Sequence, residues 1–444
     1  MARIQCRAFL IVFFRLTVGI RTVEEAAAMS MNRITRTIPI LVLLVIVLSL
    51  LSCSEQDALK WLSPSSDADV FGIVRLEVDV SMGEGVERLR FYVDAVDDAH
   101  KIGELSGDVS RVELPWFTDD VPNGVHELHA VASGFDGGTL QASVRVNVGN
   151  VSRAEAIPSD AVKMTPQTDP HPPQLHPAFA DIFDPPVPMP GPINTAGAEA
   201  SPFITPDGTE FYFWFTPDAN APLQNQLTDR STGIYYSRKV DGEWTEPVRI
   251  YLTYYDEPSL DGAHTVRGDT MWFASVRAGN FREMDMWNAT LLDGRWLNWS
   301  IVDERLNLEI GIGELHVSLD GNRITFDSSR EGGLGEKDIW MTERVGGVWQ
   351  DPLPIAAVNT ENTEGWPYVT ENELELWYTT GPGAPEIHRS LYVNGEWQPP
   401  ETVLTLFAGE PTLDNAGNLY FAHHFWDPVE DRMIEADFYV CYRK

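Results

Sequence analysis

The sequence is poor in cysteine and in basic residues, and each shortage excludes a class of protein. Three cysteines among 444 residues are too few for a disulfide framework. Lysine and arginine together number 32 against 66 acidic residues, which gives a formal net charge of −34. A protein that follows nucleic-acid phosphates needs clustered basic residues, so we expect no nucleic-acid partner.

Familiar catalytic motifs are absent as well. The sequence has no Gly-x-Ser-x-Gly elbow, no phosphate-binding loop, no His-Glu-x-x-His and no cysteine pair. His423 and His424 are adjacent in a predicted strand, where neighbouring side chains point to opposite faces and cannot hold one metal ion together. We therefore predict no cofactor and no motif-defined metal site.

Apolar residues are plentiful enough for folded cores. Hydrophobic residues make up 43% and aromatic residues 11% of the chain. At about 100–200 residues per domain, the length predicts two or three domains. The sequence does not indicate an oligomeric state.

Residues 1–52 are predicted to be an upstream leader and a signal peptide. The run 38–51 is apolar, follows Arg33 and Arg36, and is shorter than the ~20 residues that a membrane-spanning helix needs. Met1, Met29 and Met31 remain alternative starts, and an uncleaved anchor remains an alternative to cleavage.

The four residues that end this segment carry a family resemblance. Leu50-Leu51-Ser52-Cys53 resembles the lipobox of bacterial lipoproteins. The resemblance implies that Cys53 is lipidated and anchors the chain to a membrane. Because Ser54 follows the cysteine, we expect the outer membrane, with the protein facing the periplasm or the cell surface.

A short tether and then a β-sandwich are predicted next, at 53–67 and 68–150. Four segments of the second range alternate apolar and polar residues, which indicates half-buried strands (74–80, 89–95, 125–133 and 141–148). This range also resembles the immunoglobulin-like modules of secreted bacterial proteins, through Phe91-Tyr92-Val93-Asp94, Leu114-Pro115-Trp116 and Val121-Pro122-Asn123-Gly124. Such modules are usually spacers or adhesive units.

Residues 151–192 are predicted to be a proline-rich linker. Dense proline favours an extended, semi-rigid backbone. Part of the linker, within 177–193, is a candidate for the strand that completes the next domain.

From 193 to 444 the chain repeats a unit of short strands. Each unit has an opening acid, a turn and an apolar strand, and most units also have a Gly-x-Trp segment. A further strand with an aromatic residue follows in every unit but the fourth, which has Glu386-Ile387-His388 there. The unit lengths suit four-stranded propeller blades of about 40–50 residues. We predict an all-β protein in which a five-bladed β-propeller follows the immunoglobulin-like sandwich, with six blades as the alternative.

The third unit carries a second resemblance. Phe326-Asp327-Ser328-Ser329-Arg330 and Asp338-Ile339-Trp340 resemble the WD-repeat-like units of TolB-type periplasmic propellers. This resemblance concerns architecture, because such propellers serve as scaffolds, binding rings and hydrolases alike.

The opening acids are the main candidates for function. If each begins the innermost strand of a blade, five carboxylates approach one axis, where like charges raise pKa values or attract a cation. The alternative is that they accept hydrogen bonds from backbone N–H groups at the blade ends. The ligand-binding candidates are Glu199, Glu257, Glu314, Glu364 and Glu410, with Trp366 and Tyr368 as stacking platforms.

Three functions follow as hypotheses. The first is a lipid-anchored envelope protein whose propeller binds a protein or a carbohydrate without catalysis. The second is a glycoside hydrolase, in which Glu257 and Glu314 would be the paired carboxyl groups. The third is a purely structural envelope scaffold.

Overall fold

The computed structural model describes residues 57–444, except 83–84, 108–110, 382 and 428. The predicted leader, signal peptide and lipidated Cys53 lie outside the described residues. Strands dominate the described residues, in which the two α-helices, α3 (Arg153–Ala156) and α4 (Leu223–Gln226), are one turn each. The all-β prediction is confirmed. No helix within the described residues has the length and apolarity that crossing a bilayer requires.

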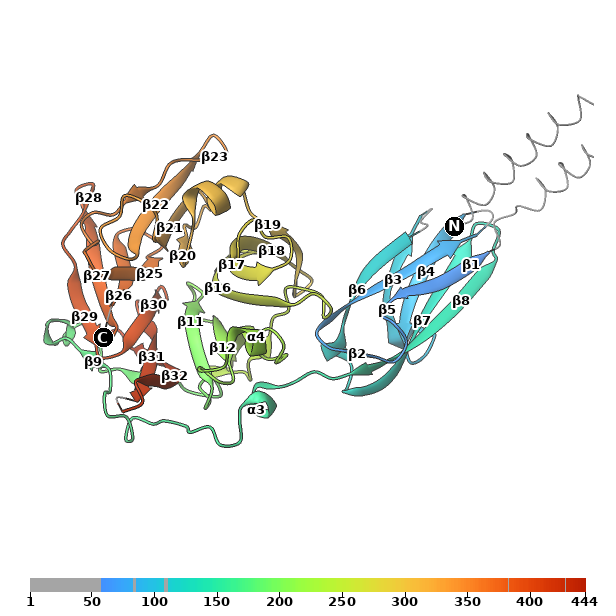
Figure 1. Ribbon diagram of the computed structural model, residues 1–444, viewed down its shortest axis with the longest axis horizontal. Coiled ribbons are helices and arrows are strands. Elements are labelled where there is room, and N and C mark those ends of the chain that lie inside the picture. Colours follow the sequence, from blue (N-terminus) through green and yellow to red (C-terminus); the bar gives the residue numbers. More distant parts are fainter. Residues whose placement is uncertain (1–56, 83–84, 108–110, 382, 428) are drawn as a thin grey trace, which may run out of the picture.

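The N-terminal part of the described chain consists of two mainly antiparallel sheets, with one parallel strand pair, that enclose one core (Figure 1). We call it the two-sheet region. The first sheet has the order β1-β3-β6, and the second has the order β2-β8-β7-β4-β5. The strands are β1 (Ala58–Ser63), β2 (Ala68–Val70), β3 (Ile73–Ser81), β4 (Val86–Val93), β5 (Lys101–Ser106), β6 (Arg111–Phe117), β7 (Gly124–Gly134) and β8 (Thr139–Val148).

The expected tether at 53–67 is wrong for its second half. Residues 58–63 form strand β1, which pairs with β3. Leu59 and Trp61 pack against the core, and the Trp61 ring meets Phe91 edge-on at 5.7 Å. The alternation in this short segment is enough to bury one face of a strand.

The C-terminal part is a set of sheets arranged around a common centre (Figure 1). We call it the ring. Its first half contains β11 (Ala198–Ile204), β12 (Glu210–Thr216), β13 (Gly233–Val240), β14 (Glu243–Trp244), β15 (Val248–Arg249), β16 (Ser259–Arg267), β17 (Thr270–Arg277), β18 (Asp285–Leu292) and β19 (Arg295–Ile301).

The second half of the ring follows the same plan of short antiparallel strands. It contains β20 (Leu315–Val317), β21 (Arg323–Ser328), β22 (Asp338–Val345), β23 (Val348–Trp349), β24 (Leu353–Pro354), β25 (Thr363–Val369), β26 (Glu375–Gly381), β27 (Glu386–Val393), β28 (Glu396–Trp397), β29 (Glu401–Thr405), β30 (Ala408–Leu413), β31 (Leu419–Asp427) and β32 (Arg432–Cys441).

The proline-rich segment 151–192 lies along the ring and adds strands to it. Strand β9 (Gln174–Leu175) pairs with β29, and β10 (Val187–Pro188) pairs with β32. Strand β10 thus belongs to the last sheet of the ring, although it precedes the strands of the first sheet in the sequence. A free sheet edge beside β32 is avoided in this way.

The two-sheet region contacts the ring directly. Ile73 pairs with Tyr254 in a parallel bridge, and the Arg75 guanidinium lies 2.6 Å from the Glu257 carboxylate. In addition, Arg295 of the ring donates hydrogen bonds to Asp119 and Asp120 of the two-sheet region, at 2.6 and 2.7 Å. The segment 151–192 therefore does not act as a spacer between the two parts.

Candidate functional site

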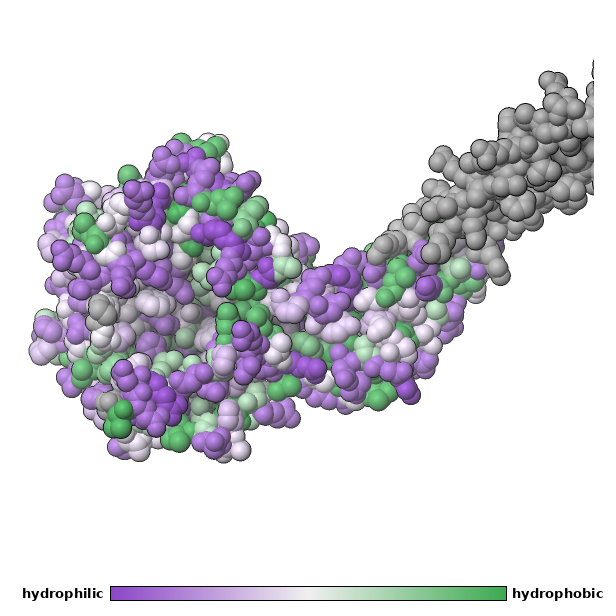
Figure 2. All heavy atoms as spheres, viewed as in Figure 1, coloured by the Kyte–Doolittle hydropathy of each residue, from purple (hydrophilic) through white to green (hydrophobic). Residues whose placement is uncertain are grey.

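A small cavity lies at the centre of the ring, lined by the innermost strand of each repeat. Its volume is about 40 Å³, enough for a few water molecules and far below the ~300–1,000 Å³ of typical ligand pockets. Figure 2 shows the face around the centre as mostly hydrophilic, with apolar residues in separate small groups. The lining residues come from β11, β16, β20, β25 and β30 and the residue before β20 (201–203, 264–265, 314–316, 366–368 and 410–412).

Arg267 lies beside this cavity, in contact with the lining residue His316. Its guanidinium donates to the Val317 carbonyl at 2.7 Å and lies 2.8 Å from Nε2 of His316, and Glu371 is 3.3 Å away. Because a guanidinium only donates, Nε2 of His316 accepts and the ring is neutral. Burial and the adjacent Arg267 hold the pKa of His316 well below its usual value. We call this central cavity the pit.

The predicted acids occupy different positions in the repeat. Four innermost strands share a bulge, where one residue has positive φ: Ser201, Ala263, Trp366 and Glu410. Aligned on this bulge, Glu410 corresponds to Ser201 and Trp366, whereas Glu199 corresponds to Glu364. The expectation that all five acids start equivalent strands is therefore wrong.

Glu199 and Glu364 fasten the backbone and do not face the cavity. Thr195 donates to Glu199 from its N–H (3.2 Å) and hydroxyl (2.5 Å), and Thr360 does the same to Glu364 (2.9 and 2.5 Å). Both carboxylates are fully buried. They fit the alternative in which the acids accept hydrogen bonds from backbone N–H groups.

Glu314 and Glu410 do line the cavity. The Glu314 carboxyl has no hydrogen-bond partner among the described residues, and burial, with Asp327 and Glu410 nearby, raises its pKa to about 8. Glu410 accepts a hydrogen bond from the Ser201 N–H and lies 3.5 Å from His424. Two carboxyl groups thus face the pit, and burial raises the pKa of one of them, Glu314.

Glu257 lies far from this arrangement. It does not line the cavity, its side chain is 51% exposed, and it pairs with Arg75 of the two-sheet region. The predicted catalytic pair Glu257 and Glu314 is therefore not brought together. The error has a physical cause: Glu257 belongs to the crossover that precedes β16, and Asp261 occupies the position equivalent to Glu199.

The two aromatic candidates differ from each other. Tyr368 is buried and donates to the Leu413 carbonyl at 2.7 Å, so it is a core residue and not an open stacking platform. Trp366 is half-buried at the cavity, and the Lys337 amine lies 5.6 Å from its ring. Only Trp366 presents an accessible ring there.

A larger cavity, missed by sequence reasoning, lies between the last two repeats. Its volume is about 480 Å³, within the range of ligand pockets. The Phe407 and Trp426 rings line it nearly parallel, with centroids 6.1 Å apart and planes at 12°. We call it the Phe407 pocket; its other lining residues are Gly383, Ala384, Pro385, His424, Asp431 and Met433.

The backbone beside this pocket is strained. Leu406 and Phe407 are consecutive bulky residues with φ of 67° and 60°, a conformation that costs about 1–3 kcal/mol per residue. The Phe407 carbonyl accepts from the His424 N–H at 2.9 Å and lies 3.2 Å from Nδ1 of His423. Asp169 of the proline-rich segment holds the other nitrogen of His423 at 2.7 Å. The surroundings therefore force Phe407 into the pocket wall.

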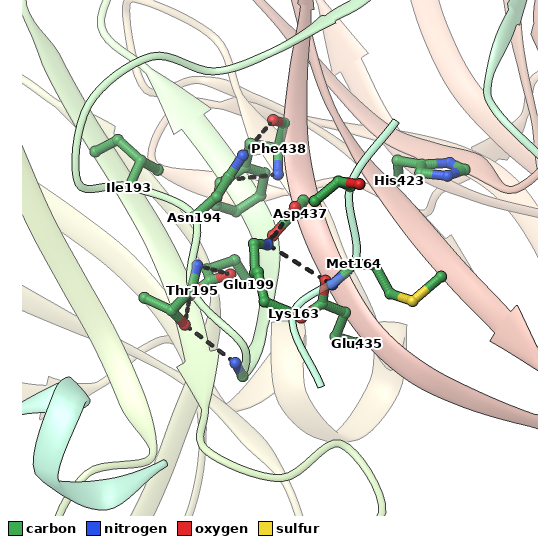
Figure 3. Close-up of polar contacts among 12 residues, drawn as sticks. Lys163, Met164, Ile193, Asn194, Thr195, Glu199, His423, Glu435, Asp437 and Phe438 are labelled. Atoms are coloured by element: carbon green, nitrogen blue, oxygen red, sulfur yellow. Dashed lines mark hydrogen bonds and ion pairs between the residues drawn. The ribbon is translucent and has the colours of Figure 1, made fainter. Parts of the chain in front are cut away.

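A second acidic cluster joins the proline-rich segment to the ring (Figure 3). Lys163 contacts both oxygens of Asp437 at 2.5 Å and Glu435 at 3.3 Å, and the Met164 N–H donates to Glu435 at 2.6 Å. Burial is the main cause that raises the pKa of Glu435 to about 8, of Glu199 to about 7 and of Asp437 to about 6. We call this cluster the Lys163 clasp.

Among the residues that the structure describes, no group of three or more His, Cys, Asp or Glu side chains is arranged to hold a metal ion. The carboxyl groups of Glu410, Glu435 and Asp437 instead contact backbone N–H groups, His424 or Lys163.

The sequence matches no protein-family model and no curated protein. Among solved structures, a gluconolactonase from Xanthomonas campestris aligns with 65% of this chain and 97% of its own, at 13% identity and TM-score 0.34. SGBP-B of the mixed-linkage glucan utilization locus of Bacteroides ovatus, in complex with a mixed-linkage heptasaccharide, aligns with 85% of this chain and 75% of its own, at 10% identity and TM-score 0.17.

An endo-β-1,4-mannanase from Thermotoga petrophila aligns with 22% of this chain, at 19% identity and TM-score 0.18. This chain spans only 20% of that enzyme's length. Similarities of this size assign neither a family nor an activity.

Proposed function

We propose that this protein is a lipid-anchored envelope protein whose ring binds a protein partner without catalysis. In this proposal Cys53 carries the lipid, residues 58–148 form an immunoglobulin-like module, and the ring is a five-bladed propeller of the TolB type. The blade count treats the largest sheet as two blades, because its halves β11–β15 and β30–β32 are joined by one parallel pair, Ala198 with Ala436.

The observation that carries the proposal is the contrast between the two cavities of the ring. The central pit, at about 40 Å³, admits no substrate, whereas the Phe407 pocket, at about 480 Å³, is open and largely apolar. Phe407, Trp426 and Met433 suit an apolar side chain of a partner. Strained residues often mark ligand-binding positions, which fits Phe407.

The net charge of the protein further restricts the chemical class of partner that we expect. With a net charge of −34, the protein attracts basic partners and repels acidic ones. Asp431 at the pocket adds a local carboxylate. We therefore expect an apolar or aromatic residue flanked by lysine or arginine on the partner.

Selection from a random 12-residue peptide library, in parallel on wild type and Trp426→Ala, tests this. We expect peptides with a basic-aromatic consensus to be enriched on wild type alone. The control is Trp397→Ala, which changes an outer-strand tryptophan away from the pocket. Equal enrichment on all three proteins would refute a role for the pocket, and binding of a glycan array lost in Trp426→Ala would identify a carbohydrate ligand instead.

The lipid anchor needs its own test. Cells that express the chain are grown with radioactive palmitate, and we expect label in wild type and none in Cys53→Ala. Label in both proteins would exclude Cys53 as the lipidated residue.

A glycoside hydrolase remains a second candidate because of one observation. A carboxyl group with a pKa of about 8, such as Glu314, would be protonated at neutral pH and suits a general acid. Turnover of aryl glycosides by wild type and not by Glu314→Gln would establish it. We expect no turnover, because a sugar does not fit the pit. If neither turnover nor peptide or glycan binding is detected, the purely structural scaffold is the remaining hypothesis.

A further inference from the structure

A third cavity lies where the two-sheet region meets the ring. Its volume is about 250 Å³, and both parts line it, with Ile73, Phe117 and Asp119 from the two-sheet region. Ligand sites often form at such domain interfaces. We call it the junction pocket. The ring contributes Glu210, Tyr212, Tyr236, Val248, Arg249, Ile250, Tyr251, Leu291, Gly294, Arg295 and Trp296.

Aromatic rings form much of the wall. Tyr212 lies against Tyr236 with ring centroids 4.9 Å apart and meets Trp296 edge-on at 6.4 Å. Phe117 and Tyr251 line the cavity as well, each beneath a guanidinium group. Such walls suit the C–H faces of a flat or ring-shaped ligand.

Hydrogen-bond donors and acceptors lie among these rings. The Glu210 carboxylate accepts hydrogen bonds from the Tyr236 hydroxyl at 2.9 Å and from the Tyr212 hydroxyl at 3.2 Å. Each phenol oxygen and each carboxylate oxygen keeps a free lone pair for a ligand hydroxyl. Arg249 bonds the Thr232 carbonyl through Nη2 at 2.8 Å, while its Nε and Nη1 have no hydrogen-bond partner among the described residues.

From these contacts we propose that the junction pocket binds one neutral sugar ring, a hexopyranose unit. Aromatic walls take its apolar faces, and Glu210 and the tyrosine hydroxyls accept hydrogen bonds from its hydroxyl groups. The volume of the junction pocket is just below that of pockets that hold drug-sized ligands. One sugar ring therefore fits, and an oligosaccharide would extend out of the pocket. The acidic protein disfavours a charged sugar acid.

This site is separate from the Phe407 pocket and does not depend on the proposed function. Because both parts line the junction pocket, a bound sugar stabilises their docked arrangement by mass action. The two-sheet region would then bind ligand together with the ring.

Isothermal titration of the protein with four probes tests the proposal: the methyl α- and β-glucopyranosides, methyl α-mannopyranoside and methyl β-galactopyranoside. We expect at least one to bind in the millimolar range. Glu210→Gln and Tyr236→Phe should each weaken binding roughly tenfold, because each changes a hydrogen bond to a charged group. Phe117→Ala should weaken binding from the side of the two-sheet region.

Two controls separate this site from its alternatives. Trp397 occupies the repeat position of Trp296, so Trp397→Phe should leave binding unchanged, whereas Trp296→Phe should weaken it. Phe407→Ala should also have no effect. Absence of binding by all four probes up to about 50 mM, or binding that is lost in Phe407→Ala and kept in Glu210→Gln, would overturn the proposal. If Trp296→Phe fails to fold, Glu210→Gln and Tyr236→Phe still decide.

Discussion

Two crossovers of the ring carry the same motif in different surroundings. In each crossover an asparagine side chain donates to the carbonyl and accepts from the N–H of one strand residue. Asn194 bonds Phe438 of β32 in this way, at 2.9 Å for each bond, and Asn359 bonds Ile339 of β22 at 2.8 and 3.0 Å. A threonine follows each asparagine and binds the glutamate four residues later. The crossovers at 194–199 and 359–364 therefore make the same local hydrogen bonds.

The difference lies in the neighbouring aspartate. Asp338 accepts the N–H groups of Leu334 and Gly335 from its own hairpin, at 2.9 and 3.1 Å. Asp437, at the equivalent place, is held by Lys163 from the proline-rich segment. One crossover is completed by nearby residues, whereas the closing crossover depends on a segment more than 270 residues away in the chain.

Replacing Lys163 should have the largest effect on this comparison. Lys163→Met leaves Asp437 and Glu435 buried without their positive partner, so we expect a loss of about 2–3 kcal/mol, less than for a fully buried pair because Lys163 is 38% exposed. Urea unfolding measures it. Lys337→Met is the matched control, since Lys337 approaches Asp327 at 3.2 Å and is 42% exposed. Equal losses would contradict a special dependence on the clasp.

The two asparagines should give similar, smaller effects. Asn194→Ala and Asn359→Ala each remove two hydrogen bonds from an outer strand, for about 2 kcal/mol each. The comparison is sharpened by combining each with Lys163→Met: only Asn194→Ala, which lies beside the clasp, should be non-additive. Additivity in both double variants would show that the clasp and the motif act independently.

Stability should depend on pH through the clasp. Folding raises the pKa of Glu435 to about 8, so the folded state binds more protons than the unfolded state between about pH 5 and 8. Stability from this group is therefore present at low pH and lost as pH rises towards 8. Glu435→Gln mimics the protonated acid, and should flatten the decline between pH 6 and 8 by about 2 kcal/mol. An unchanged pH profile would exclude Glu435 as its source.

The smallest effect is expected at the junction with the two-sheet region. Glu257→Gln removes an ion pair whose acid is 51% exposed, so the loss should be under about 1 kcal/mol. Activity on aryl glycosides, if any is found, should be unchanged, because Glu257 is outside the pit. A change in either beyond these limits would restore Glu257 as a functional residue.

Much of the architecture could be predicted from local pattern. Alternation in 74–80 and 141–148 indicated strands that the structure contains as β3 and β8, and the linker within 177–193 was a candidate for a strand of the next domain, which the structure contains as β10. These predictions need only the period of the strand and the need to cover sheet edges. Strand β1 was missed because six residues between polar neighbours resemble a tether.

The site was less predictable, because small shifts in register decide which side chains face the axis. The bulge that turns Glu410 and Trp366 towards the pit displaces them from the position of Glu199 and Glu364. The recurring Asn-Thr-x-x-x-Glu at 194–199 and 359–364 is a signal in the sequence that would have shown these two acids to be structural. The Phe407 pocket had no such signal, since it is formed where loop residues such as Pro385 and Phe407 meet side chains of β31 and β32.

The pairing of β10 with β32 has a consequence for the order of synthesis. A ribosome makes Val187–Pro188 long before Tyr439–Val440, so the outermost position of the final sheet waits for a partner while almost all of the ring is made. Contacts this distant in sequence form slowly. Until the last dozen residues appear, the nascent ring has an open seam, and any variant truncated before β32 leaves that seam permanently available to another chain.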